Sequence, residues 1–219
     1  MCVVVAHGML SFKGSEKHRA VCETLAASGV AALRFDFRGR GESEGEPTNL
    51  TVSNEVEDFS TVVSFLRSRG FRRIAAIGSS LGGTVALLAG ARDRGLAVLV
   101  TIAAPARFPN GPREAWGGSG QVVDDRLIEV APGEFIHREF FIDAAKHDPI
   151  QAARAIECPW LIIHGAEDPV VPVEDATLLT KNSLNAELLT HPTAGHRFDQ
   201  PEEREWLIER VAGFITDHS

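Results

Sequence analysis

Short apolar runs alternate with longer amphipathic stretches along most of this chain. The apolar runs have the length of strands and lack polar alternation, which indicates strands covered on both faces. These strands are expected at 2–6, 30–35, 73–78, 97–103, 159–164 and 186–190. Helical periodicity predicts helices at 15–28, 52–69, 81–94, 149–156, 173–182 and 201–217. The alternation predicts an α/β fold with a mostly parallel sheet of about six strands and helices on both faces.

The alternation breaks between residues 106 and 146. This stretch has no clear period and is rich in Pro, Gly and aromatic residues, including Pro109, Pro112, Pro132, Gly117, Gly118, Gly120 and Trp116. Long irregular stretches inside a compact domain are commonly functional loops or lids. We expect one domain over 1–219 with a cap or lid inserted at 106–146. Its apolar side chains would cover a site at the carboxyl edge of the sheet, namely Phe135, Ile136, Phe140 and Phe141. A surface excursion with a small core of its own is the alternative.

Composition excludes several classes of protein. A chain of 219 residues, 44% of them hydrophobic, can bury a full core as one domain. The formal net charge of -8 argues against a nucleic-acid partner, which would require a basic face. The spacing of Cys2, Cys22 and Cys158 suits neither a disulfide framework nor a thiolate metal site. The opening MCVVVAHG lacks the features of a signal peptide, and no apolar run nears the roughly 20 residues of a membrane span. We therefore expect a soluble, cytoplasmic protein that does not bind a membrane.

Residues 78–82 read Gly-Ser-Ser-Leu-Gly and stand between an expected strand and an expected helix. A Gly-x-Ser-x-Gly motif in this context places its serine on a sharp strand-to-helix turn, where small flanking residues let the two elements pass closely. Ser80 has glycines two positions before and after it, whereas Ser79 has Ile77 and Leu81. Ser80 is therefore the candidate nucleophile, and Ser79 has no assigned role.

A serine hydroxyl needs a base to take its proton and a third group to orient that base. In a parallel sheet, both partners belong on loops at the carboxyl ends of later strands. Asp168 follows the strand expected at 159–164, and His196 follows the strand expected at 186–190. Asp168 is the candidate acid and His196 the candidate base, and their order after the serine is that of α/β hydrolases.

Other residues could take the same two roles. Glu167 is the alternative acid, and His164 and His191 are the alternative bases. Both histidines stand at the ends of expected strands, where a packed structural histidine is commoner than a catalytic one. Position in the chain therefore favours Asp168 and His196.

The oxyanion that forms during acyl transfer needs hydrogen-bond donors. The amide of Leu81 begins the helix after the nucleophile, where the helix dipole favours negative charge. A second donor is expected from the loop after the first strand, because Gly8 allows that loop to approach closely. The amide of Met9 is the candidate there, with Leu10 as the alternative. An ordinary strand-ending turn is the competing interpretation of this loop.

Two further features of the sequence do not indicate a binding site for a cofactor or a metal. The loop at 36–43 reads DFRGRGES and lacks the glycine spacing of nucleotide-binding loops. We expect a structural loop at the edge of the site, held by hydrogen bonds of Asp36 and Ser43. His137 and His147 have no nearby partner at metal-ligand spacing. No metal and no organic cofactor is expected.

The motifs HGM, DFRGRGES, GSSLGG, HGAEDPVVP and AGHRF, in this order, resemble those of the α/β-hydrolase superfamily along the whole chain. The segment from RFDFRGRGES to GSSLGG is similar to that of small cytoplasmic carboxylesterases, including cinnamoyl and feruloyl esterases, and of their serine-peptidase-like relatives. The resemblance implies an α/β-hydrolase fold. It also implies roles for five residues: a triad of Ser80, His196 and Asp168, and oxyanion donors at Met9 and Leu81.

Three hypotheses follow for the activity. The leading one is hydrolysis of a small-molecule carboxylic ester through an acyl-enzyme. A peptidase or amidase with the same triad is the second, and a non-catalytic ligand-binding module on the same fold is the third. The complete set of serine, aspartate and histidine favours an enzyme. No sequence feature indicates the oligomeric state or the natural acyl group.

Overall fold

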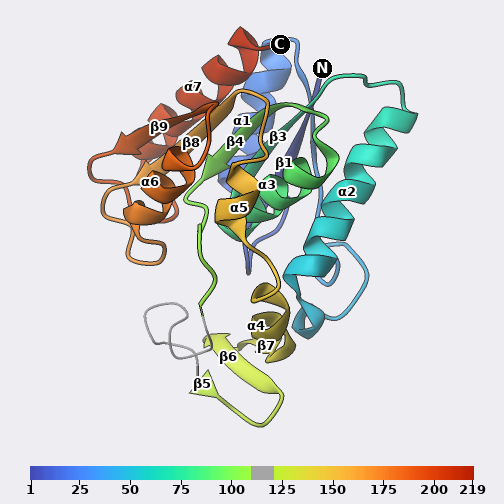
Figure 1. Cartoon of the computed structure of the whole chain (residues 1–219), viewed down its shortest axis with the longest axis vertical. Coiled ribbons are helices and arrows are strands. Elements are labelled where there is room, and N and C mark those ends of the chain that lie inside the picture. Colours follow the sequence, from blue (N-terminus) through green and yellow to red (C-terminus); the bar gives the residue numbers. More distant parts are fainter. Residues whose placement is uncertain (110–120) are drawn as a thin grey trace.

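A six-stranded parallel sheet forms the centre of the computed structural model, which describes residues 1–109 and 121–219 (Figure 1). Its strands are β1 (Cys2–Ala6), β2 (Ala31–Arg34), β3 (Ile74–Ser79), β4 (Leu96–Ile102), β8 (Trp160–Gly165) and β9 (Ala186–His191). They lie in the order β2-β1-β3-β4-β8-β9, and each neighbouring pair is parallel. The predicted α/β class and number of core strands are confirmed.

Helices cover both faces of this sheet. On one face lie α1 (Glu16–Ala27) and α7 (Pro201–Asp217), whose apolar side chains share a buried cluster with the strands. On the other face lie α2 (Val52–Ser68), α3 (Leu81–Asp93), α5 (Pro149–Ala153) and α6 (Val173–Lys181), around a second buried cluster. A short 3-10 helix, η1 (Pro47–Asn49), precedes α2. Within the described part of the chain, we find no helix with the length and apolarity of a membrane span.

The winding of the chain reverses at β1. From β1 the chain passes through α1 to β2 at the sheet edge, and then returns through α2 to β3 on the other side of β1. Open α/β sheets bind ligands where the winding reverses, at the carboxyl ends of the strands. The loops after β1 and β3 therefore border the expected site, and the loops after β8 and β9 open at the same edge.

Between β4 and β8 the chain forms regular elements that the sequence pattern did not predict. They are the strands β5 (Gln121–Val122), β6 (Leu127–Ala131) and β7 (Glu134–His137), which pair antiparallel, and the helix α4 (Glu139–Ala144). Each is short and none is a continuous apolar run; in β6, for example, the buried Ile128 and Val130 alternate with partly exposed residues. This small sheet lies at the end of the molecule away from both termini (Figure 1).

The small sheet and α4 are packed onto the body of the protein. Ile136, Phe140 and Phe141 are buried in the same cluster as α2 and α3, and Phe135 is half-buried. Asp143 of α4 accepts hydrogen bonds from the amide (2.8 Å) and the hydroxyl (2.7 Å) of Ser53 in α2. These contacts anchor the second half of the insertion, whereas its role as a lid stays a prediction. The predicted features Pro112, Trp116, Gly117, Gly118 and Gly120 lie outside the described residues.

Two glycines allow β3, α3 and the loop after β1 to meet. A Cβ atom on Gly82 would lie 2.2 Å from the carbonyl oxygen of His7, and one on Gly78 would lie 2.3 Å from the carbonyl oxygen of Gly82. Contacts this short do not occur, so the turn between β3 and α3 requires hydrogen as the side chain at both positions.

We predict that Gly82→Ala lowers the free energy of unfolding by about 2 kcal/mol or more, because the added methyl group pushes α3 away from the loop after β1. Urea denaturation measures the change. Gly213→Ala in α7 is the matched control, since a Cβ there meets nothing within 4 Å. The control should gain about 0.5–1 kcal/mol from alanine's better helix propensity. Equal stability of Gly82→Ala and the wild type would contradict the close approach.

Candidate active site

Ser80 lies on a strained turn between β3 and α3. Its backbone has φ 52° and ψ −126°, which is a disfavoured conformation for a residue with a side chain. Its amide donates a hydrogen bond to the carbonyl of Ile102 in β4 (2.8 Å), and its carbonyl accepts from the amide of Gly83 (2.9 Å). These bonds hold the turn in place, and the serine side chain is left partly exposed at the carboxyl edge of the sheet.

Two of the predicted partners lie in line with this serine. The Nε2 atom of His196 is 3.0 Å from the Oγ atom of Ser80, and its Nδ1 atom is 2.7 Å from the Oδ2 atom of Asp168. The Asp168 side chain is fully buried, and 16% of the His196 side chain is exposed. An Nδ1–H that donates to the carboxylate leaves Nε2 free to accept the serine proton. The structure thus brings together three residues that are far apart in the sequence.

The loop after β8 holds the Asp168 carboxylate in its ionised form. The Oδ1 atom of Asp168 accepts hydrogen bonds from the amides of Val170 (2.8 Å) and Val171 (2.9 Å). Burial raises the pKa of this carboxyl, but hydrogen bonds from His164, His196 and the loop backbone lower it by more. The net pKa lies well below the ordinary value for aspartate, so the group is negatively charged at neutral pH.

The loops after β8 and β9 are joined by their backbones. The amide of Ala166 donates to the carbonyl of His191 (2.8 Å), and the amide of Glu167 donates to the carbonyl of Ala194 (3.1 Å). A Cβ atom on Gly165 would lie 2.1 Å from the same Ala194 oxygen. This close contact sets the distance between the carboxylate and the imidazole.

The alternative acid and one alternative base have other positions. Glu167 is exposed, and the hydrogen bond to His196 is made by Asp168 instead. His191 accepts a hydrogen bond from the amide of Ala194 at its Nδ1 atom (3.2 Å) and so supports the loop that carries His196. Neither side chain belongs to the line of hydrogen bonds from Ser80 to Asp168.

His164 is close to the acid rather than to the serine. Its side chain is fully buried, and its Nε2 atom lies 2.9 Å from the carbonyl oxygen of Val171 and 3.3 Å from the Oδ2 atom of Asp168. Sequence analysis identified this histidine only as an alternative base and missed its contact with the acid. Its place at the end of a buried strand, four residues before the aspartate, was the available signal.

The loop after β1 packs directly against the turn that carries Ser80. A Cβ atom on Gly8 would lie 3.0 Å from the Cβ atom of Ser80, and Leu10 has a positive φ of 59°. Within the described part of the chain, the amides of Met9 and Leu81 donate no hydrogen bond to another protein group. Two unpaired donors beside a serine can bind a negative oxygen.

His7 stabilises this loop as a neutral side chain. Its Nδ1 atom lies 2.9 Å from the carbonyl oxygen of Gly8, and its Nε2 atom accepts a hydrogen bond from the amide of Phe37 (3.2 Å). Burial lowers the pKa of His7, which keeps the ring neutral. A neutral ring that accepts at Nε2 donates at Nδ1, so His7 links the loops after β1 and β2.

The loop at 36–43 is held as the sequence predicted. The two carboxylate oxygens of Asp36 accept hydrogen bonds from the amides of Lys13 (2.6 Å) and Glu42 (3.0 Å). The hydroxyl of Ser43 donates to the carbonyl of Asp36 (2.6 Å). The predicted roles of Asp36 and Ser43 are confirmed.

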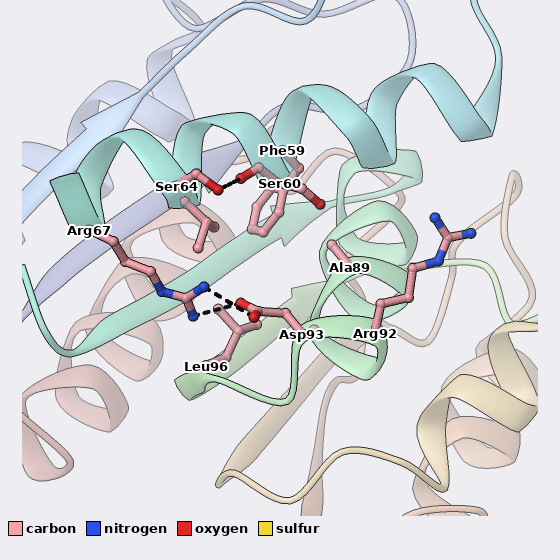
Figure 2. Close-up of a pocket in the computed structure, with 10 residues that line it drawn as sticks. Phe59, Ser60, Ser64, Arg67, Ala89, Arg92, Asp93 and Leu96 are labelled. Atoms are coloured by element: carbon pink, nitrogen blue, oxygen red, sulfur yellow. Dashed lines mark hydrogen bonds and ion pairs between the residues drawn. The ribbon is translucent and has the colours of Figure 1, made fainter.

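A pocket of about 220 Å³ lies between α2 and α3, away from this serine (Figure 2). Its lining comes from the second half of α2, the last turns of α3 and Leu96, and an ion pair joins Arg67 to Asp93 (2.6 Å). Ser80 precedes the first residue of α3, so the pocket is at the opposite end of that helix. In the ranges 1–109 and 121–219, no cluster of three or more His, Cys, Asp or Glu side chains is suited to holding a metal.

This chain is similar to several known proteins over nearly its whole length. A monoacylglycerol lipase from Mycolicibacterium smegmatis is 28% identical to this chain, over 99% of the chain and 88% of the lipase. The human mitochondrial palmitoyl-protein thioesterase ABHD10 is 23% identical, over 97% of this chain and 72% of its own length. Among solved structures, Est1E from Butyrivibrio proteoclasticus with bound ferulic acid superposes with a TM-score of 0.90 and 26% identity, covering 99% of this chain and 88% of Est1E.

The family assignment comes from a match over nearly the whole chain. The sequence profile of the alpha/beta hydrolase family matches residues 3–209, from the first strand of the sheet into the last helix. The predicted α/β-hydrolase fold is confirmed by this match and by the superposition on Est1E. This chain belongs to the alpha/beta hydrolase family.

Proposed function

We propose that this protein is a serine hydrolase that cleaves carboxylic esters through an acyl-enzyme intermediate. The observation that carries the proposal is the line of hydrogen bonds from Ser80 through His196 to Asp168. The names of two relatives, a monoacylglycerol lipase and a palmitoyl-protein thioesterase, support acyl transfer from an ester or thioester. The substrate in this proposal is a small-molecule ester, and the reaction needs no cofactor.

Acylation begins when the Ser80 oxygen attacks the carbonyl carbon of the ester. The serine proton passes to Nε2 of His196, and the Asp168 carboxylate stabilises the positive imidazolium through Nδ1. The bond between the carbonyl carbon and the alcohol oxygen then breaks. The alcohol leaves with the proton from Nε2, so the serine is acylated and the histidine is neutral again.

Deacylation repeats these steps with water as the nucleophile. Water gives one proton to Nε2 of His196 while its oxygen bonds to the acyl carbon. The bond to the Ser80 oxygen breaks, and that oxygen takes the proton back from the imidazolium. The carboxylic acid is released, and the protein returns to its starting state.

Both half-reactions pass through a tetrahedral intermediate with a negative oxygen. The amides of Met9 and Leu81 are the proposed donors to this oxygen, because they border Ser80 and are unpaired among the described residues. Leu81 is also the first residue of α3, where the helix dipole favours negative charge. Such donors are worth most where they are held in place before the reaction begins.

We predict that Ser80→Ala lowers the turnover of short activated esters by at least about 10³-fold, because the variant has no oxygen that can be acylated. Turnover of p-nitrophenyl esters measures the effect. Ser60→Ala, in the pocket between α2 and α3, is the matched control and should keep wild-type turnover. Ester turnover of Ser80→Ala within tenfold of the wild type would overturn the assignment of the nucleophile.

A panel of esters, thioesters and aminoacyl amides separates the hydrolase alternatives. We expect esters of the same acyl group to be cleaved faster than the amides, because the alcohol is the better leaving group. Covalent labelling of Ser80 by a fluorophosphonate reports a reactive serine independently of the substrate. An amide cleaved faster than its matched ester would favour a peptidase or amidase, and failure to label would favour a non-catalytic binding module.

The charge of Asp168 should also make stability depend on pH. Because its folded-state pKa is lowered, the carboxylate stabilises the fold above the ordinary aspartate pKa of about 4, and this contribution is lost as the pH falls. Asp168→Asn is therefore expected to unfold more easily than the wild type at pH 7, by about 2 kcal/mol. The difference should shrink as the pH is lowered from 5 to 3. Urea denaturation over this range measures it, and a constant difference would contradict a buried charged carboxylate.

A further inference from the structure

The face of β3 that packs against α1 ends in a polar residue. Side chains alternate along a strand, so Ala75, Ile77 and Ser79 point to the same side of the sheet. Ala75 and Ile77 are buried in the cluster formed with α1 and α7. Ser79 continues this row with only 5% of its surface exposed, immediately before Ser80. A hydroxyl group therefore stands where the row of apolar side chains would continue.

The face of α1 that packs against the sheet also ends in a polar residue. The buried residues of α1 are His18, Val21 and Leu25, which lie on one side of the helix. Val21 and Leu25 belong to the same apolar cluster as β3. His18, in the first turn, is 3% exposed. The α1–β3 contact is thus apolar along its length and polar at the end next to the nucleophile.

The two polar residues meet. The Nε2 atom of His18 is 3.3 Å from the Oγ atom of Ser79, and its Nδ1 atom is 2.6 Å from the Oγ atom of Ser15. Ser15 is the N-cap residue of α1, but its side chain makes no capping hydrogen bond to the helix backbone. Three side chains therefore form a line from the start of α1 to the residue before the nucleophile.

The imidazole in this line is neutral. Burial, together with the nearby charge of Lys17, lowers the pKa of His18 to about 3. A neutral imidazole has one donor and one acceptor nitrogen, which matches two hydroxyl partners. The line from Ser15 through His18 to Ser79 therefore carries no charge at neutral pH.

Stability alone does not account for a polar pair at this place. Two apolar side chains would extend the existing contact between α1 and β3, and replacing a buried polar pair by apolar groups is often neutral or stabilising. The position of the pair is more informative. The carbonyl oxygen of Ser79 lies 3.0 Å from where a Cβ of Gly8 would be, so this residue borders both the nucleophile turn and the loop after β1.

We propose that His18 and Ser79 are positioning residues, whose hydrogen bond holds the strained turn of Ser80 in the geometry needed for attack. Without this bond the residue before Ser80 is free to relax, and the serine oxygen moves relative to His196 and the Leu81 amide. A small displacement of the attacking oxygen slows the chemical step, whereas it has little effect on substrate affinity. The inference rests on the proposed function, since it assumes that Ser80 is the nucleophile.

A double-mutant cycle with Ser79→Ala and His18→Leu tests the proposal. Each single variant and the double variant should lose kcat by a similar factor, roughly tenfold, with KM unchanged, because each removes the same hydrogen bond. The double variant should unfold at the same temperature as the wild type or higher, since it restores an apolar contact. His18→Gln, which keeps hydrogen-bonding groups, should recover part of the lost kcat. Ser28→Ala at the exposed C-terminal end of α1 is the matched control and should leave kcat unchanged.

Two readouts distinguish failure of this inference from failure of the proposed function. Alongside ester turnover, the rate at which a fluorophosphonate labels Ser80 is measured for every variant. If the wild type is labelled but cleaves no ester, the proposed function fails, and slower labelling of the folded double variant still supports the positioning role. Wild-type rates of both turnover and labelling in the folded double variant would overturn it. Absence of labelling in the wild type would overturn both proposals.

Discussion

The close approach of β3, α3 and the loop after β1 is the constraint on which the site depends. A serine in the conformation of Ser80 is strained by about 1–3 kcal/mol, so the surrounding structure must hold it there. The bond from its amide to Ile102 connects it to the neighbouring strand, and Gly82 lets α3 begin directly against the His7 carbonyl. The same approach brings the loop with the Met9 amide to within reach of the serine. The strained conformation of Ser80 and the two unpaired amides beside it therefore depend on one packing arrangement.

The histidine and the aspartate depend on a second arrangement of the same kind. The strands β8 and β9 are parallel neighbours, so the loops after them leave the same end of the sheet, and Gly165 lets the backbone at Ala194 pass closely. His164 adds a buried hydrogen-bonding group beside the acid, and His191 supports the turn that leads to His196. The two histidines that sequence analysis named as alternative bases thus contact Asp168 and the loop that carries His196. In both arrangements, glycine sets how near two backbones come.

The sequence predicted most of this structure because the relevant signals are local. Buried parallel strands are continuous apolar runs, so the expected strands at 2–6 and 186–190 agree with β1 and β9 to within one residue. Gly-x-Ser-x-Gly selected Ser80 from two adjacent serines through its neighbours alone. The antiparallel strands after β4 were missed because they are short and none of them is a continuous apolar run. The bond from His18 to Ser79 was missed because it joins residues 61 positions apart, and it follows only from which faces of α1 and β3 meet.

The contact between His18 and Ser79 was missed although the sequence contains a signal for it. The apolar rows of α1 and β3 each end in one buried polar residue, His18 and Ser79. A buried polar residue in such a row is rarer than an exposed apolar residue on the surface. The same first turn of α1 places Lys17 against the backbone carbonyl of Arg197 (3.4 Å), beside the base. The start of α1 therefore contacts the nucleophile turn through one residue and the histidine loop through its neighbour. A helix that contributes no group to the line from serine to aspartate thus contacts the residue before Ser80 and the residue after His196, so the distance between this serine and this histidine depends on how α1 is packed.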